Sequence, residues 1–221
     1  MDREAPPGVG HTAHVSGGLP FHLPVVPWGR WVVATTVVLL VGLSLYYLTY
    51  QPYSAAKSFI AAFGSQSTTT VAERLTLAER SFDTFPSLAN FPRAIFFTQL
   101  ADEWDDLNEE ERSQALSLVT RELSEGLELE PEGFSLMVSA VLVLRQDPTT
   151  MPMAESLLER IREVAPERVQ THVLLAEQEL LKGNPQEAVR IAEEYESRVP
   201  GTEWFFQEVK RTAQNGLLAP D

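Results

Sequence analysis

The chain has 221 residues, with 31 acidic and 17 basic side chains and a formal net charge of −14. A surface this acidic repels a phosphate backbone, so the charge argues against nucleic acid as a partner. The sequence has no cysteine, which excludes disulfide bonds, thiolate metal sites and cysteine nucleophiles.

The first segment, residues 1–30, is rich in Gly, Pro and His, in phrases such as APPGVG and VSGGLP. Such a composition buries too little apolar surface to form a core, so we expect a disordered tail or linker. HTAH (11–14) has two histidines at a spacing that can bind a metal on a helix, and His22 stands alone. Because no acidic or thiol side chain stands beside them, we predict no metal site here.

The next segment, WVVATTVVLLVGLSLYYLTY (31–50), carries no charge. A helix of about 20 residues rises roughly 30 Å, the thickness of a hydrocarbon core. Aromatic residues lie at both ends, where the membrane interfaces would be: Trp28, Trp31, Tyr46, Tyr47, Tyr50 and Tyr53. We predict a transmembrane helix. A buried core helix would be shorter and show a polar face, and a cleaved signal peptide would have a shorter apolar core and a small-residue cleavage site.

The orientation of this helix follows from the basic residues beside it. Arg3 and Arg30 precede the apolar segment, and only Lys57 follows it within about 20 residues. Basic residues favour the cytoplasmic side, so we predict a cytoplasmic amino terminus and an extracytoplasmic carboxy-terminal domain.

Residues 51–221 hold 15 of the basic and 29 of the acidic side chains. Apolar residues return every three or four positions in ERLTLAERSF (73–82) and RAIFFTQLADEW (93–104), which indicates amphipathic helices. Asn108 followed by Glu111 is a capping-box pattern at a helix start. No segment alternates like a strand, so the sequence predicts an all-α fold.

A repeat is visible in GNPQEAVRIAEEYESRVPG (183–201) when it is shifted back by 34 residues. Ala188 then aligns with Ala154, and Pro200 with Pro166. A small residue lets two antiparallel helices cross closely, and a proline ends the second helix so that the chain can turn. The sequence here resembles tetratricopeptide repeats, whose helix–turn–helix unit has this period.

That resemblance implies an α-solenoid of helical hairpins after the membrane helix. Residues 51–133 would form degenerate hairpins, and residues 134–221 two repeats plus a capping helix. We expect that helix over residues 202–214, with Trp204, Phe205 and Val209 covering the last repeat and Gly216 past its end. His172, Ala176 and Glu179 stand where the family often has Trp, Gly and Tyr. A general helical-hairpin solenoid is therefore the alternative.

No catalytic motif accompanies the helices. G-x-S-x-G, H-E-x-x-H, phosphate-binding glycine loops and dinucleotide fingerprints are all absent from the sequence. The carboxylates of DEWDD (102–106) and EEE (109–111) lack the glycine that a calcium loop needs at its bend. We therefore expect no catalytic residue, metal or cofactor, and a protein that is not an enzyme.

Partner binding is the function that remains. In stacked hairpins the first helix of each repeat lines the concave face. Its positions that point away from the core would contact a peptide or a partner helix. In the last two repeats, helical phase gives Ser139, Leu142, Arg145, Gln170, His172, Gln178 and Glu179.

A second resemblance rests on the order of the segments. The membrane helix, YQPYSAAKSFIAAF (50–63), RAIFFTQLADEWDDL (93–107) and the repeat around Pro166 to Glu177 resemble the carboxy-terminal tail of the O-antigen ligase and polymerase family. That family's activity belongs to a many-span domain, so no catalytic residue carries over. The resemblance implies a bacterial inner membrane. Three interpretations stay open: an anchored scaffold for a protein partner, a detached tail of a glycan ligase, and an ancillary factor of a secretion translocase.

Overall fold

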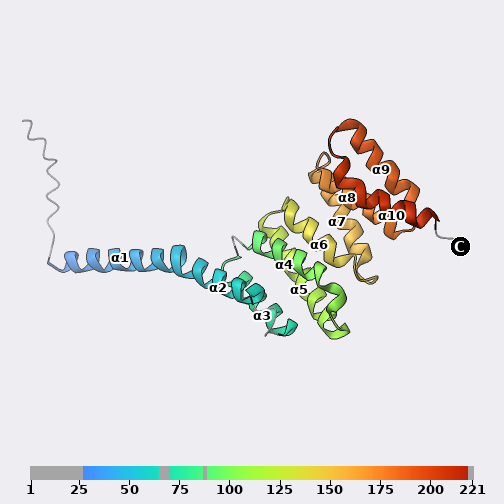
Figure 1. Cartoon of the computed structure of the whole chain (residues 1–221). Helices are drawn as coiled ribbons and strands as arrows, with labels where there is room; N and C mark the ends of the chain where they lie inside the picture. The colour runs from blue at the N-terminus through green and yellow to red at the C-terminus, as the bar shows by residue number, and fades with distance from the viewer. Residues whose placement is uncertain (1–26, 65–69, 87–88, 219–221) are drawn as a thin grey trace, which may run out of the picture. The chain divides into compact units, whose positions relative to one another are not determined.

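The computed structural model describes residues 27–64, 70–86 and 89–218, in two compact units, Met1–Leu45 and Tyr46–Asp221 (Figure 1). Every regular element in these ranges is a helix, and none of them contains a strand. The predicted all-α class is confirmed. The prediction of a disordered tail over 1–30 is wrong for residues 27–30, which are already helical. The remainder of that tail, with His11, His14 and His22, lies outside the described residues.

The first unit contains helix α1, Pro27–Leu45. A candidate membrane span of 33 residues, Trp31–Phe63, begins in this helix, and its most apolar stretch of 18 residues has a mean hydropathy of 2.0. None of its most apolar stretch is buried, and every side chain from Trp31 to Tyr50 is exposed. A core helix of a soluble domain would be mostly buried. This helix is long and apolar enough to span a membrane.

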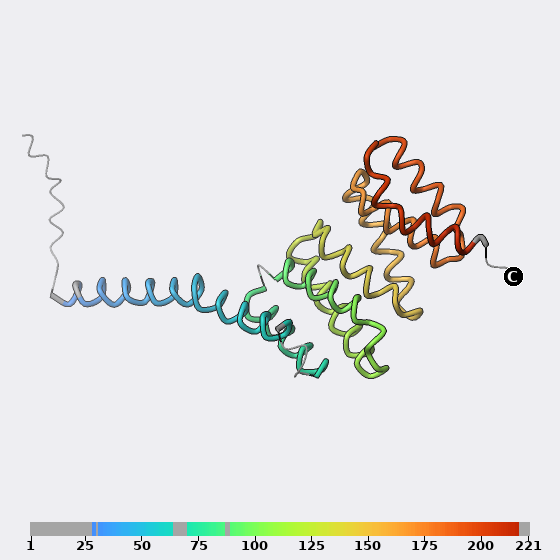
Figure 2. The backbone as a smooth tube through the Cα atoms, viewed as in Figure 1, coloured from blue at the N-terminus to red at the C-terminus, as the bar shows by residue number. Residues whose placement is uncertain are grey.

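The second unit begins with the π-helical turn η1 (Tyr46–Tyr50), whose Tyr46 and Tyr50 rings are stacked with centroids 5.7 Å apart. The helices that follow are traced in Figure 2. They are α2 (Gln51–Gly64), α3 (Val71–Thr84), α4 (Asn90–Asp102), η3 (Trp104–Asp106), α5 (Glu109–Leu129), α6 (Phe134–Leu144), α7 (Met151–Val164), α8 (Val169–Leu181), α9 (Pro185–Arg198), η4 (Glu203–Phe206) and α10 (Gln207–Leu218). Consecutive helices pack as pairs, α2 with α3, α6 with α7 and α8 with α9.

Local sequence explains where several of these helices begin and end. Asn108 caps α5: its side chain accepts from the Glu111 backbone N–H at 3.0 Å, and Glu111 accepts from the Asn108 N–H at 3.0 Å. This predicted capping box is confirmed, and Thr70 with Glu73 forms a second one at α3. Gly183 follows the end of α8 with a φ of 76°, a conformation that glycine adopts without strain.

The predicted 34-residue register matches the helix positions. Helix α9 begins at Pro185, 34 residues after α7 begins at Met151. Ala154 and Ala188 are each the fourth residue of their helix, and each is 0 % exposed. Pro166 and Pro200 are exposed and lie just after α7 and α9. The alanines therefore stand where the paired helices are in contact.

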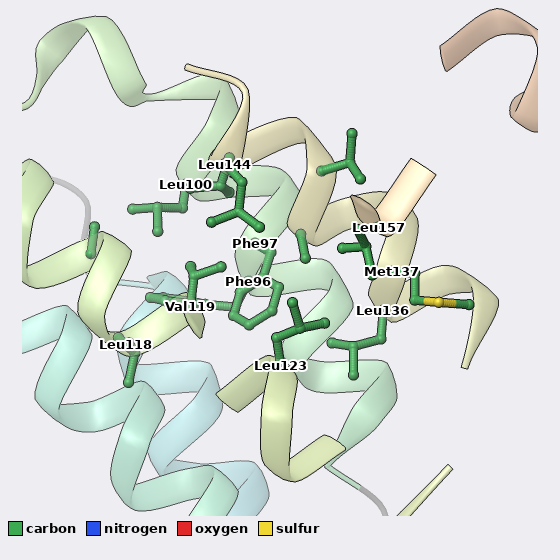
Figure 3. Close-up of a cluster of buried hydrophobic side chains, with 14 of the residues drawn as sticks. Phe96, Phe97, Leu100, Leu118, Val119, Leu123, Leu136, Met137, Leu144 and Leu157 are labelled. Atoms are coloured by element: carbon green, nitrogen blue, oxygen red, sulfur yellow. The ribbon is translucent and has the colours of Figure 1, made fainter. Parts of the chain in front are cut away.

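The main hydrophobic core of the second unit joins α4, α5, α6 and α7 (Figure 3). Phe96, Phe97, Val119, Met137 and Leu144 are among its buried side chains. Two smaller clusters follow toward the carboxy terminus. One contains Ala176, Ala188 and Val209, and the other contains Ala192, Tyr195 and Phe206. The carboxy-terminal helices are therefore held by fewer and smaller apolar contacts than the centre.

Two expectations about the carboxy-terminal helix are wrong. We expect Trp204 to cover the last repeat, but it is 62 % exposed, and Phe206 is the buried aromatic residue of that segment. Gly216 does not follow the helix, because α10 continues to Leu218. The 3-10 turn η4 precedes α10 and has about three residues per turn. Its aromatic side chains therefore point in other directions than they would in one continuous α-helix.

An ion pair is buried between α4 and α5. The Arg93 and Glu122 side chains are 1 % and 0 % exposed, and Arg93 Nε and Nη2 both donate to Glu122 Oε2, at 2.9 and 2.7 Å. Burial raises the pKa of the Glu122 carboxyl, and the arginine hydrogen bonds only partly oppose it.

Close by, Gly126 lets α5 approach α4 and α6, because a Cβ there would collide with Leu136 and Asn90.

Candidate functional site

A groove runs along helix α8, between α7 and α9, and we call it the α8 groove. Its volume is about 350 Å³. Helix α8 contributes one face to it, from His172 to Lys182. Its apolar part consists of the buried Leu158 and the half-buried Leu175 and Ile191, one from each helix. Side chains of all three helices thus define one continuous surface within the second unit.

Charged side chains border this apolar strip. The carboxylates are Glu155, Glu159, Glu179, Glu187 and Glu194, and the cations are Arg162, Lys182 and Arg190. Each of the last two cations lies between two carboxylates. Lys182 Nζ is 3.2 Å from Glu155 and 3.3 Å from Glu179, and Arg190 is 2.6 Å from Glu187 and 2.9 Å from Glu194.

These ion pairs shift the pKa values of Lys182 and Glu187, each in the direction that favours the charged form. Burial lowers the pKa of Lys182, but its hydrogen bonds to Glu155 and Glu179 outweigh burial, so the pKa is raised. The hydrogen bond from Arg190 holds the pKa of Glu187 below its ordinary value. Both effects favour the charged forms of Lys182 and Glu187.

Gln178 lies at the centre of the α8 face and is 4 % exposed. Its Nε2 donates to Glu155 Oε1 at 3.2 Å and to the Met151 sulfur at 3.4 Å. No donor among the described residues reaches its Oε1. A buried acceptor without a partner costs roughly 1 to 3 kcal/mol, which makes it a place where a bound donor would be favourable.

Three of the seven predicted partner-binding residues line this groove: His172, Gln178 and Glu179. His172 is held in place, because its Nε2 is 2.8 Å from the Pro166 carbonyl oxygen and its ring centroid is 4.4 Å from that of Tyr195. Gln178, however, does not point to solvent as predicted. Its amide turns toward α7 to bond Glu155, which buries it.

The other four residues lie elsewhere. Ser139 is 3 % exposed and its hydroxyl donates to the Leu136 carbonyl, so the prediction that it faces outward is wrong. Helix α6 is apolar nearly all round, and such a helix gives no polar face from which phase could be read. Leu142 is half-buried against the main core, and Arg145 pairs with Glu177 of α8 at 2.5 Å. Gln170 is exposed and lies outside the groove lining.

The groove also contains residues that sequence reasoning missed. Glu159 and Arg162 come from α7, and Arg190 and Glu194 from α9. The repeat pattern places the first helix of each repeat on the concave face, so it does not predict that charges of the second helix line a groove. Their i, i+3 and i, i+4 spacing on amphipathic helices is the signal that could have placed them on one exposed face.

The acidic segments form no comparable site. Asp102, Asp105 and Asp106 are exposed around the buried Trp104. The carboxylates of Asp83, Glu122 and Glu125 approach within 4.8 Å of one another, but Arg93 already bonds two of them. An arginine is therefore the counter-ion of this cluster.

A second hollow, of about 730 Å³, lies between α5 and the loop before α7. Arg112 there donates to the carbonyls of Trp104 and Asp105, and Arg121 pairs with Glu79 at 2.7 Å. Its arginines are thus committed to the fold. The α8 groove, with an unpartnered acceptor and an apolar strip, is the stronger candidate for a binding surface.

Comparison with known protein families, with curated proteins and with solved structures found no match to this chain. The tetratricopeptide and glycan-ligase resemblances therefore stay predictions, and function has to be argued from the geometry.

Proposed function

We infer that this protein is a membrane-anchored docking module that holds a protein partner in the α8 groove and has no catalytic activity of its own. The observation that carries the proposal is the groove itself, in which three helices border an apolar strip with charges on both sides. Charged rims around an apolar centre are typical of protein–protein interfaces. A helical surface of this kind suits a partner peptide or helix better than a small cofactor.

The anchor in this proposal is the apolar helix over residues 31–50. All of its side chains are exposed in the isolated chain, so lipid would supply the environment that the fold does not. Trp28, Trp31 and the tyrosines at 46, 47 and 50 would lie at the two interfaces. The hairpins with their 34-residue spacing support a tetratricopeptide-like solenoid as the scaffold.

The proposal is tested by photo-cross-linking in living cells. A photoreactive residue replaces Arg162, whose side chain is 64 % exposed at the groove, or Glu163, its exposed neighbour outside the groove. We expect a discrete protein adduct from position 162 and little or none from position 163. Equal labelling at both positions, or none at position 162, would contradict docking in the groove.

The identity of the adduct separates three partner classes. A polytopic glycan-transfer enzyme would favour a detached ligase tail, an assignment supported by the order of the membrane helix, residues 50–63, residues 93–107 and the repeats. A translocase subunit would favour an ancillary secretion factor. Any other membrane or envelope protein would favour an independent scaffold.

We further propose that the chain lies in a bacterial inner membrane with its amino terminus in the cytoplasm and residues 51–221 outside. Arg3 and Arg30 on one side against Lys57 on the other support this orientation. An alkaline phosphatase fused after Asp221 is then expected to be active, because that enzyme works only outside the cytoplasm. An inactive phosphatase fusion, with an active cytoplasmic reporter at the same point, would reverse the orientation.

A further inference from the structure

The charge balance of the α8 groove restricts what can bind there. Five carboxylates and three cations line the groove, a difference of two negative charges, and Arg198 outside the lining approaches Glu194 at 3.9 Å. Lys182 and Arg190 are each shared between two carboxylates, and Arg162 lies 3.9 Å from Glu159. These cations are paired with the chain's own glutamates, so an acidic ligand would have to displace those glutamates from the cations.

The hydrogen-bonding groups of the groove also favour a ligand rich in donors over an acidic ligand. Glu159 and Glu194 have side chains 69 % and 54 % exposed, so their oxygens can accept from a ligand. Gln178 Oε1 has no donor among the described residues either, but it is buried beside α7, so a ligand would reach it only after the amide turned. The groove therefore has acceptors to spare, which matches a partner rich in N–H donors such as lysine and arginine.

The apolar strip adds a second requirement. Leu158, Leu175 and Ile191 would bind aliphatic or aromatic side chains of a ligand and lose their contact with water. The α8 face from His172 to Lys182 covers eleven residues, with about 15 Å of helical rise between the first and the last. Two to three turns of a partner helix present apolar anchors at i, i+3, i+4 and i+7 over a comparable length.

We propose that the occupant of the α8 groove is a cationic amphipathic segment of a protein, whose apolar side contacts Leu158, Leu175 and Ile191 and whose lysines or arginines pair with Glu159 and Glu194. This inference rests on the proposed docking function and names the partner's chemistry. The net charge of −14 on the chain would also attract such a segment from a distance.

The test uses the full chain in nanodiscs of zwitterionic lipid and a fluorescent synthetic peptide that repeats leucine and lysine at helical spacing. Fluorescence anisotropy measures its binding, and empty nanodiscs correct for partition into lipid. We expect saturable binding that weakens as salt rises. The same peptide with glutamate in place of lysine is expected not to bind.

Two double variants locate the binding site. Glu159→Lys with Glu194→Lys reverses the charge of the groove. This double variant is expected to weaken binding of the lysine peptide about tenfold or more. The matched control, Glu163→Lys with Glu193→Lys, changes the net charge equally on the same two helices but outside the groove lining, and is expected to have an effect of less than about twofold. Circular dichroism checks that both variants keep their helix content.

Equal weakening by both double variants, binding of the glutamate peptide, or no saturable binding would each overturn the cationic assignment. The cross-linking result at position 162 distinguishes this failure from failure of the docking proposal. A discrete adduct together with a failed peptide experiment would leave a docking groove for a partner of other chemistry. Loss of the adduct would remove both.

Discussion

Replacement of Arg93 with methionine is expected to lower the free energy of unfolding by about 3 to 5 kcal/mol. The guanidinium is the buried counter-ion of Glu122, and it also donates to Glu125 at 3.2 Å and to Asn90 at 3.3 Å. Without it, a carboxylate with 0 % exposure would retain only Arg121, 3.1 Å away at the edge of the site. Such a group must be protonated or must open the α4–α5 contact to water.

Urea unfolding followed by circular dichroism at constant detergent measures this effect. The control is Arg80→Met, an exposed residue on α3, for which we expect a change within about 0.5 kcal/mol. The double replacement Arg93→Met with Glu122→Leu is expected to recover most of the loss, because removing both charges leaves no unpaired one. An Arg93 variant no less stable than the Arg80 variant would mean that the ion pair does not hold α4 and α5 together.

Replacement of Ala188 with leucine is expected to lower the free energy of unfolding by about 1 to 3 kcal/mol, the usual penalty for overpacking. Ala188 is 0 % exposed in the small cluster with Ala176 and Val209, where α8, α9 and α10 meet. Three additional carbon atoms would have to displace one of these helices. Ala154→Leu is expected to behave similarly, because Ala154 holds the same position in α7 and is equally buried.

Gln186→Leu is the control for this substitution. It introduces the same side chain two residues away, at an exposed position of α9, and should change stability by about 0.5 kcal/mol or less. If Ala188→Leu and Gln186→Leu have equal, small effects, the 34-residue register does not mark the close helix crossings.

Local signals in the sequence predicted the helices well. Asn108 with Glu111 and the prolines at 166 and 200 act within one turn of their own helix end, so their effect can be predicted without tertiary structure. The alanines at 154 and 188 could be predicted to be buried because a small residue that recurs with the period of the repeat indicates a close helix crossing.

Long-range pairing could not be predicted in the same way. Arg93 and Glu122 are 29 residues apart and each looks like an ordinary surface charge on an amphipathic helix. Water is excluded from both only when α4 and α5 pack together with their neighbours, among them Phe82 of α3, whose ring centroid is 5.5 Å from the Arg93 guanidinium. Ser139 was misplaced for a related reason, because a short helix buried on nearly every side has no polar face to orient it.

The binding site was predicted in part. His172, Gln178 and Glu179 of α8 line the groove, since helical phase determines which residues share a face, but Gln178 is buried rather than directed outward as predicted. It did not identify Glu159 on α7 or Glu194 on α9, because these enter the groove only through the packing of three helices. Most charged side chains of the groove thus come from α7 and α9, and they become neighbours only when the three helices pack together.

The measurement that bears most directly on the docking groove is the in-cell cross-linking yield at Glu194 compared with that at Glu193. The two glutamates are adjacent and exposed on α9, but only Glu194 lines the groove. Our account predicts a discrete protein adduct from position 194, mapped to a partner segment with lysine or arginine beside apolar residues, and little from position 193. Equal yields at the two positions would contradict it.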